Sequence, residues 1–296
     1  MRPILVIGAA GQLGRELMLR RDAARRPIVG FSHGELDVRD CDGVRRAITD
    51  TAPALVINAA AYTQVDKAES ECEAAFAVNR DGPANLATAC VEAAIPLLHV
   101  STNYVFDGRK EGPYIEGDPV APLGVYGASK FAGEEAIRQR LERHVILRTA
   151  WVYGAHGTNF VKTIARLAGE RPALSVVDDQ RGGPTPAGSI AEALLAVTNA
   201  IRGGSARWGT YHFCGAPATS WCGFARAIVD AAGPYLGRRV VVRPIATADY
   251  PLPAKRPANS VLDCGKIAAT FGIASPDWRA SLPAILAGIF GKEPVP

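Results

Sequence analysis

The stretch ILVIGAAGQLG, residues 4–14, contains the strongest fold signal in this chain. Its four leading apolar residues predict a buried strand, and the glycines after them predict a tight turn into a helix. In such a unit the first glycine turns the chain, the second lets the backbone approach a pyrophosphate, and the third lets helix and strand pack closely. The N–H groups of the helix N-terminus attract the same anion. Gly8, Gly11 and Gly14 therefore predict a dinucleotide-binding unit.

Residues 1–150 continue this alternation of short apolar runs and longer helical patterns. The order is typical of βαβ units, whose right-handed crossovers build a doubly wound parallel sheet. The predicted strands are Ile4–Gly8, Ile28–Phe31, Leu55–Asn58, Pro96–Ser101 and Val145–Arg148. The two longest predicted helices are Glu69–Ala94, which Asn79 and Pro83 shape or interrupt, and Tyr126–Arg140. We therefore expect an α/β fold with a Rossmann-like NAD(P)-binding domain in residues 1–150.

The composition changes after about residue 150, where proline and glycine become frequent, as in QRGGPTPAG (180–188) and PLPAKRPANS (251–260). Such segments predict shorter elements and longer connections. We expect residues 151–296 to form mainly a smaller, substrate-binding lobe beside the doubly wound sheet. Some of its segments should return to the sheet, and Tyr211–Phe213 is the candidate for a late strand.

The composition of the whole chain argues against several classes of protein. Its 296 residues suffice for a sizeable core, and a net charge of +4 with scattered basic residues predicts no nucleic-acid-binding stripe. No apolar run approaches the length of a transmembrane helix, and the N-terminal run is too short for a signal peptide. The six cysteines form no Cys-x-x-Cys pair, which indicates reduced thiols. We expect a cytoplasmic protein with no nucleic-acid partner, no membrane partner and no metal site.

Tyr126 and Lys130 are four residues apart in VYGASK (125–130), so they share one face of a helix. At a separation of ~5 Å and an effective dielectric of ~20, the ammonium attracts a phenolate by roughly 3 kcal/mol. We therefore expect Lys130 to lower the pKa of Tyr126 by about two units from its reference of about 10. A tyrosine tuned in this way suits acid–base catalysis near neutral pH. Beside a dinucleotide, the pair predicts a hydride-transfer centre.

Two further motifs follow predicted strands, at the sheet edge where open α/β folds bind their ligands. STNYVF (101–106) places the Thr102 hydroxyl there, as a hydrogen-bond donor for a substrate carbonyl. NAAAYT (58–63) has small residues that leave room for a flat cofactor. The histidines are isolated in the sequence, and we expect them to be structural.

The end of the second predicted strand bears on the choice of cofactor. The sequence there is Phe31-Ser32-His33, with no carboxylate that would repel a 2′-phosphate. We therefore expect NADPH to be used at least as well as NADH. Asp37, in ELDVRD (35–40), lies in a loop that could meet the adenine.

GAAGQLG (8–14), NAAAYT, STNYVF and YGASK (126–130) together resemble the extended short-chain dehydrogenase/reductase superfamily. More specific motifs resemble the dTDP-4-dehydrorhamnose reductase family, from Ile4 to about Asp263. These motifs are AAAYTQVDKAES (59–70), RTAWVYG (148–154), TNFVKT (158–163), DDQRGGPT (178–185) and KRPANSVLD (255–263).

The resemblance implies that NAD(P)H reduces the C4 ketone of dTDP-4-dehydro-6-deoxy-L-mannose to give dTDP-L-rhamnose. It implies that Tyr126 donates the proton, that Lys130 binds the nicotinamide ribose, and that Thr102 orients the keto oxygen. Asn103, Trp151 and Arg256 correspond to substrate contacts. The residues implied along the cofactor, besides Tyr126 and Lys130, are Gly8, Gly11, Gln12, Leu13, Gly14, Asp37, Val38, Ala61, Tyr62 and Thr63.

The chain departs from the family pattern at several positions. Asn103 stands where relatives often have aspartate, and Arg181 replaces a residue that is aromatic in some of them. Some members bind Mg²⁺ through glutamates at a dimer interface. Glu16 matches one of these, but Gly188 and Gly288 stand at the other two positions. We therefore expect no Mg²⁺ at these positions. The sequence does not decide whether the protein forms a homodimer.

The same residues bear on other functions of related enzymes. A 4,6-dehydratase needs an acid and a base beside its threonine, whereas Thr102 is followed by Asn103 and Tyr104. Another nucleotide-sugar reductase or a 4-epimerase is not excluded by the catalytic residues alone, although the C-terminal motifs speak against it. A non-catalytic NADP-binding regulatory subunit would not need Thr102, Tyr126 and Lys130 together.

Overall fold

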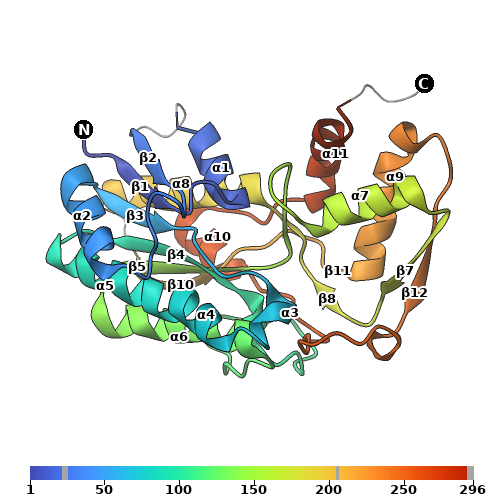
Figure 1. Cartoon of the computed structure of the whole chain (residues 1–296), viewed down its shortest axis with the longest axis horizontal. Coiled ribbons are helices and arrows are strands. Elements are labelled where there is room, and N and C mark those ends of the chain that lie inside the picture. The colour runs from blue at the N-terminus through green and yellow to red at the C-terminus, as the bar shows by residue number, and fades with distance from the viewer. Residues whose placement is uncertain (22–25, 205–206, 292–296) are drawn as a thin grey trace.

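The computed structural model describes residues 1–21, 26–204 and 207–291. Its centre is a six-stranded, fully parallel sheet in the order β10-β5-β4-β3-β1-β2 (Figure 1). The strands are β1 (Ile4–Ile7), β2 (Ile28–Phe31), β3 (Leu55–Asn58), β4 (Leu97–Thr102), β5 (His144–Thr149) and β10 (Gly209–His212). The expected Rossmann-like α/β fold is confirmed, and each predicted strand matches an observed one to within two residues.

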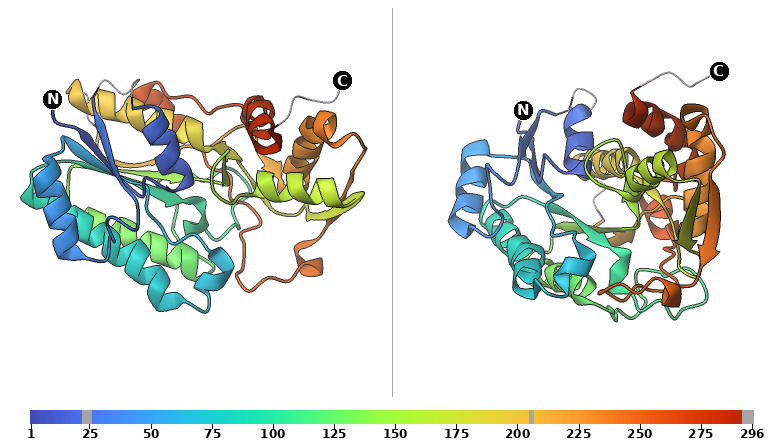
Figure 2. Two further views of the ribbon diagram at one scale, coloured as in Figure 1. Left: turned by 45° about the horizontal axis from the view of Figure 1, so that its top comes forward. Right: turned by 45° about the vertical axis from the view of Figure 1, so that its right-hand side comes forward.

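Helices cover both faces of the sheet, as Figure 2 shows from two sides. One face packs on α1 (Gln12–Leu19), α8 (Ala187–Arg202) and α10 (Gly265–Phe271). The other packs on α2 (Cys41–Thr51), α5 (Gly82–Glu92) and α6 (Val125–Arg140). Because both faces are buried, the strands are nearly continuous apolar runs without polar alternation.

The second half of the chain builds a smaller lobe and also returns to the sheet. In the lobe, α7 (Phe160–Glu170), α9 (Trp221–Leu236) and α11 (Leu282–Phe290) share a separate apolar core. Its short strands pair as β6 (Val152–Tyr153) with β9 (Thr185–Pro186), β7 (Ala173–Val177) with β12 (Val241–Ile245), and β8 (Arg181–Gly182) with β11 (Thr219–Ser220). The expected late strand is confirmed as β10, which pairs with β5.

The predicted helix Glu69–Ala94 corresponds to contiguous helical segments from Cys72 to Glu92, and it is shaped at Asn79 as expected. After α3 (Val65–Ala68) come α4 (Cys72–Phe76), a π-helical turn (Ala77–Asp81) and α5. Asn79 lies in the π turn and bonds the backbone of Tyr62, while Pro83 occupies the first turn of α5, where an N–H is not needed.

Short 3₁₀ turns complete the element list, at Asn103–Val105, Thr247–Asp249 and Trp278–Ser281. Within the described ranges, no helix combines the length and the apolar character needed to cross a bilayer.

Candidate functional site

The glycine-rich turn after β1 is packed so closely that two of its glycines have no room for a side chain. Gly8 has φ +84°, and a Cβ there would lie 2.7 Å from the backbone nitrogen of Ala60. A Cβ on Gly14 would lie 2.1 Å from the carbonyl oxygen of Gly8. The tight turn and the close helix–strand packing expected from the sequence are therefore confirmed.

The same turn presents the N-terminus of α1 to an anion. Gly11 caps the helix, and no described side chain bonds the helix end. Leu13 is buried, so its side chain belongs to the core, whereas the amide of Gln12 accepts from Asn159 of the second lobe at 2.9 Å. A pyrophosphate fits this cradle through backbone N–H groups.

The segment Ala61–Thr63 follows β3 beside this turn. Asn79 holds its backbone by accepting from the Tyr62 N–H at 2.9 Å and donating to the Tyr62 carbonyl at 3.0 Å. The Tyr62 hydroxyl donates to Glu71 at 2.6 Å, and this bond raises the pKa of Tyr62 to about 12. A cofactor would therefore meet mainly a rigid backbone at Ala61–Thr63.

Residues Phe31-Ser32-His33 carry no carboxylate, but the structure brings a neighbouring one to the end of β2. Glu35 folds back through a tight turn and accepts from the Ser32 hydroxyl at 2.6 Å and the Ser32 N–H at 2.8 Å. These bonds lower the pKa of Glu35 and keep it charged. Asp37, the predicted adenine neighbour, is bound by Arg39 at 2.5 Å, and Val38 is buried.

The predicted catalytic residues lie at the C-terminal edge of the sheet. Thr102 ends β4, while Tyr126 and Lys130 lie one turn apart in the first half of α6. The Thr102 hydroxyl is close enough to Tyr126 to lower its pKa by hydrogen bonding, and Tyr104 packs edge-on against the Tyr126 ring at 5.7 Å. Thr102 and Tyr126 thus lie near each other, with Lys130 one helical turn further along α6.

The electrostatics of this group differ from expectation. Burial raises the pKa of Tyr126 to about 12, and the Thr102 hydrogen bond offsets only part of that rise. Burial also lowers the pKa of Lys130 to about 8, against the attraction of Glu134. The predicted lowering of the Tyr126 pKa is therefore wrong, because removal from water disfavours the phenolate more than its neighbours stabilise it.

The Lys130 amine turns toward the sheet. It donates to the Val100 carbonyl at 2.7 Å and lies 3.3 Å from Nε2 of His99. Nδ1 of His99 lies 3.0 Å from the amide of Asn58, and all of these side chains are buried. The sequence analysis missed His99 and Asn58. The available signal was a polar residue in each of two adjacent apolar strands, at positions that pair in register.

A buried ion pair holds α6 against the sheet. Glu134 accepts from Arg148 of β5 at 2.7 Å, from the Ser101 hydroxyl at 2.5 Å and from Arg138 at 2.7 Å. Burial alone would raise the pKa of Glu134, but Arg148 and the other donors keep it below its usual value. Since Glu134 is one turn beyond Lys130, this pair also positions the helix face that bears Tyr126 and Lys130. Sequence reasoning missed it too.

The residues implied as substrate contacts come from several segments. Arg256, after β12, pairs with Asp66 of α3 at 2.7 Å and hydrogen-bonds Tyr104. Asn103 is buried; its amide nitrogen donates to the Ser260 carbonyl at 3.2 Å and its oxygen accepts from the Thr102 hydroxyl at 3.3 Å. Arg256 and Asn103 thus join C-terminal segments to the catalytic edge.

Trp151 lies apart from this group, on the lobe side. Its ring stacks on Trp221 of α9 with centroids 3.6 Å apart, and a Cβ on Gly182 would come within 2.5 Å of the indole. Its φ of +45° turns the chain between β5 and β6.

The region of Glu16, one of the positions matched to Mg²⁺ binding, contains an arginine that pairs with the carboxylates. Glu16 pairs with Arg20 at 2.6 Å, and Arg20 also pairs with Glu192 at 3.0 Å. A Cβ on Gly188 would meet the Arg20 guanidinium at 2.8 Å. Among residues 1–21, 26–204 and 207–291, no cluster of three or more histidine, cysteine or acidic side chains could hold a metal ion.

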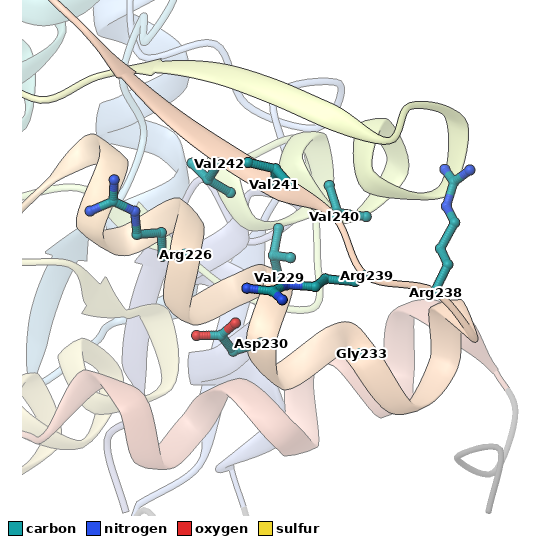
Figure 3. A pocket seen from close by; sticks show the side chains of 9 residues that line it. All are labelled: Arg226, Val229, Asp230, Gly233, Arg238, Arg239, Val240, Val241 and Val242. Carbon is teal, nitrogen blue, oxygen red and sulfur yellow. The ribbon is translucent and has the colours of Figure 1, made fainter.

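A cavity of about 390 Å³ lies in the second lobe, between α9 and β12 (Figure 3). Its lining consists of Arg226, Val229, Asp230, Gly233, Arg238, Arg239, Val240, Val241 and Val242. This lining includes none of the site residues predicted from the sequence, so in the described chain the cavity is separate from the catalytic edge.

Comparisons of sequence agree on one family. The family model described as the RmlD substrate binding domain matches residues 1–289. A dTDP-4-dehydrorhamnose reductase of Aggregatibacter actinomycetemcomitans is 46% identical over 97% of this chain and 99% of its own length. The enzyme of the same name from Sinorhizobium fredii is 42% identical over 94% of each chain.

Solved structures show the same relationship. A dTDP-4-dehydrorhamnose reductase of Clostridium acetobutylicum superposes with a TM-score of 0.90 at 36% identity, over 96% of this chain and 98% of that one. The enzyme of that name from Bacillus anthracis, solved in complex with NADP, has a TM-score of 0.88 at 33% identity over the same shares.

Proposed function

The chain belongs to the dTDP-4-dehydrorhamnose reductase family, and on that premise we propose that it reduces the C4 ketone of dTDP-4-dehydro-6-deoxy-L-mannose to dTDP-L-rhamnose with NADPH or NADH. The observation that carries the proposal is the cluster at the carboxyl end of β4. There Thr102 lies close enough to Tyr126 to lower its pKa, and Lys130 lies one helical turn further along α6.

The protein's own groups supply the proton and the orientation, and bound NAD(P)H would supply the hydride. With a pKa of about 12, Tyr126 keeps its proton at neutral pH and can give it to a developing alkoxide, which is a stronger base. Thr102 would turn its hydroxyl away from Asn103, to which it donates at 3.3 Å, and donate to the keto oxygen instead. Lys130 offers an N–H to the nicotinamide ribose.

The cofactor and substrate sites follow from the same arrangement. Gly8, Gly11 and Gly14, with the backbone of Gln12 and Leu13, would hold the pyrophosphate. Ala61–Thr63 would line the middle of the cofactor, and Asp37 and Val38 the adenine. Residues 1–150 form the dinucleotide-binding domain in this proposal, and residues 151–296 mainly the substrate-binding lobe.

Substrate binding would draw on Thr102, Asn103, Trp151 and Arg256. Asn103 would orient Thr102, because its side-chain oxygen accepts a hydrogen bond from the Thr102 hydroxyl at 3.3 Å. Arg256 would serve the nucleotide's negative charge while it remains paired with Asp66.

The test is to follow NADPH and NADH oxidation with dTDP-4-dehydro-6-deoxy-L-mannose and to identify the product. Production of dTDP-L-rhamnose supports the reductase. Cofactor oxidation that gives the C4 epimer of this product would indicate another nucleotide-sugar reductase, and turnover without net cofactor oxidation would indicate an epimerase. Absence of turnover with intact NADPH binding would indicate a regulatory subunit. Tyr126→Phe should cut turnover by ~10²–10⁴-fold with cofactor binding retained, whereas Tyr104→Phe, which keeps the packing ring, should cost less.

Assembly and location complete the proposal. All six cysteines are free thiols, which supports a reducing compartment such as the cytoplasm. A homodimer rests on the family resemblance alone, and light scattering of the purified protein tests it.

A further inference from the structure

Lys130 stands at the end of a buried hydrogen-bonded chain that begins at the backbone of Ala60. The carbonyl oxygen of the Asn58 side chain accepts from the Ala60 N–H at 3.0 Å. The NH₂ group of Asn58 is therefore the one that faces Nδ1 of His99, at 3.0 Å. Because an amide NH₂ can only donate, Nδ1 is the acceptor and carries no proton.

The remaining proton of His99 follows from the charge of its ring. The ring is completely buried, and burial, the largest cause, keeps its pKa well below the usual value, with the positive charge of Arg138 and nearby His144 acting in the same direction. The ring is thus neutral and carries one proton. Since Nδ1 is bare, that proton is on Nε2, 3.3 Å from Nζ of Lys130.

This tautomer points a donor at Lys130. An ammonium has three donors and no acceptor, whereas a neutral amine has one lone pair and two N–H groups. The Nε2–H of His99 can therefore bond only the neutral amine. In that form the Val100 carbonyl takes one N–H at 2.7 Å and one N–H is left for a ligand, whereas the ammonium would leave two and a charge.

We propose that His99, held by Asn58 in the Nε2–H tautomer, is a positioning residue that favours the neutral amine of Lys130 and so sets the pH at which this lysine is protonated. The inference rests on the proposed function, in which Lys130 binds the nicotinamide ribose.

Other groups around Lys130 also affect whether it is protonated. Glu134, one turn along α6, favours the ammonium, but its carboxylate is shared with Arg148 of β5 and with Arg138. Tyr126 on α6 and Tyr104 after β4 are neutral phenols at physiological pH, because burial raises the pKa of each. His99 is thus the group on β4 that opposes Glu134.

The first test needs no substrate. In the wild-type protein with ¹⁵N-labelled histidine, two-bond ¹H–¹⁵N spectra at pH 7 report which ring nitrogens are protonated, and His99→Gln assigns the signals. We expect His99 to be protonated on Nε2 alone. A proton on Nδ1, or on both nitrogens, would overturn the proposal. Because this readout is independent of activity, it is separate from a failure of the proposed reductase function.

The second test is the pH profile of kcat/KM. In His99→Gln the amide can turn its oxygen to the ammonium, and in Asn58→Asp the carboxylate accepts from Nδ1–H and leaves Nε2 bare. Both changes should raise the pKa of Lys130, which burial lowers to about 8, and so move the alkaline midpoint upward by about one pH unit or more. His144→Gln, a matched change on β5, should leave it in place. An unmoved midpoint in both variants would refute the role of His99.

Discussion

Replacing Glu134 by glutamine removes the negative charge at the centre of the network that holds α6 on the sheet. The side chains of Glu134 and Arg148 are 0% and 2% exposed, so water cannot compensate for the loss. Within the described part of the chain, Nη1 of Arg148 already has no hydrogen-bond partner. Breaking a buried pair by removing one partner costs about 3–5 kcal/mol, because the other charge stays buried. The glutamine oxygen can keep one bond, so we expect a loss of about 3 kcal/mol.

Thermal and urea unfolding at pH 7 measure this change. At about 2–4 °C per kcal/mol, the expected loss lowers Tm by roughly 6–12 °C. The control is Glu135→Gln, which removes a 43% exposed carboxylate that also pairs with Arg138 and should change stability by less than about 1 kcal/mol.

The pH dependence gives an independent check on the same pair. The pKa of Glu134 is lowered in the folded protein, so its stabilisation is present above the unfolded pKa of about 4.3 and is lost as the pH falls through the folded value. The difference between wild type and Glu134→Gln should therefore shrink in acid. A variant within about 1 kcal/mol of the wild type at pH 7 would refute the reasoning, as would a gap that is equally large at pH 7 and in acid.

Three further variants test the cofactor site. Lys130→Ala should weaken NADPH binding by about 10–100-fold, the effect of one charge-assisted hydrogen bond, and an unchanged dissociation constant by calorimetry would contradict contact with the ribose. Gly14→Ala should lower the free energy of unfolding in urea by about 1–3 kcal/mol and weaken NADPH binding, because its Cβ would lie 2.1 Å from the carbonyl oxygen of Gly8. Gly11→Ala, whose Cβ would lie 3.3 Å from the same oxygen, should be less destabilised. The reverse order would be inconsistent with the packing. Glu35→Gln should raise the NADPH-to-NADH ratio of kcat/KM about tenfold by removing repulsion of the 2′-phosphate, and an equal ratio would place that phosphate beyond the reach of Glu35.

Local patterns predicted most of the sheet. The apolar runs Ile4–Ile7 and Leu55–Asn58 are strands because their residues are buried on both faces, which is visible in the sequence as unbroken hydrophobicity. The glycine spacing predicted the turn and the packing of α1 for a partly local reason, since Gly11 and Gly14 contact the backbone of Gly8 a few residues away, whereas Gly8 itself contacts the distant backbone of Ala60. The sequence predicted that Asn79 shapes its helix but not that the turn is π-helical, and the bond from Asn79 to the distant backbone of Tyr62 is visible only in the structure.

By itself, the sequence determined the doubly wound architecture, the cradle at Gly8–Gly14, and the choice of Thr102, Tyr126 and Lys130 as candidates. Those features depend on spacing along one strand, one turn or one helix. Only the tertiary structure decided the charge states, because desolvation depends on every segment that packs around a group. It raised the pKa of Tyr126 where a two-residue argument lowered it, and it brought His99 to Lys130 from a neighbouring strand.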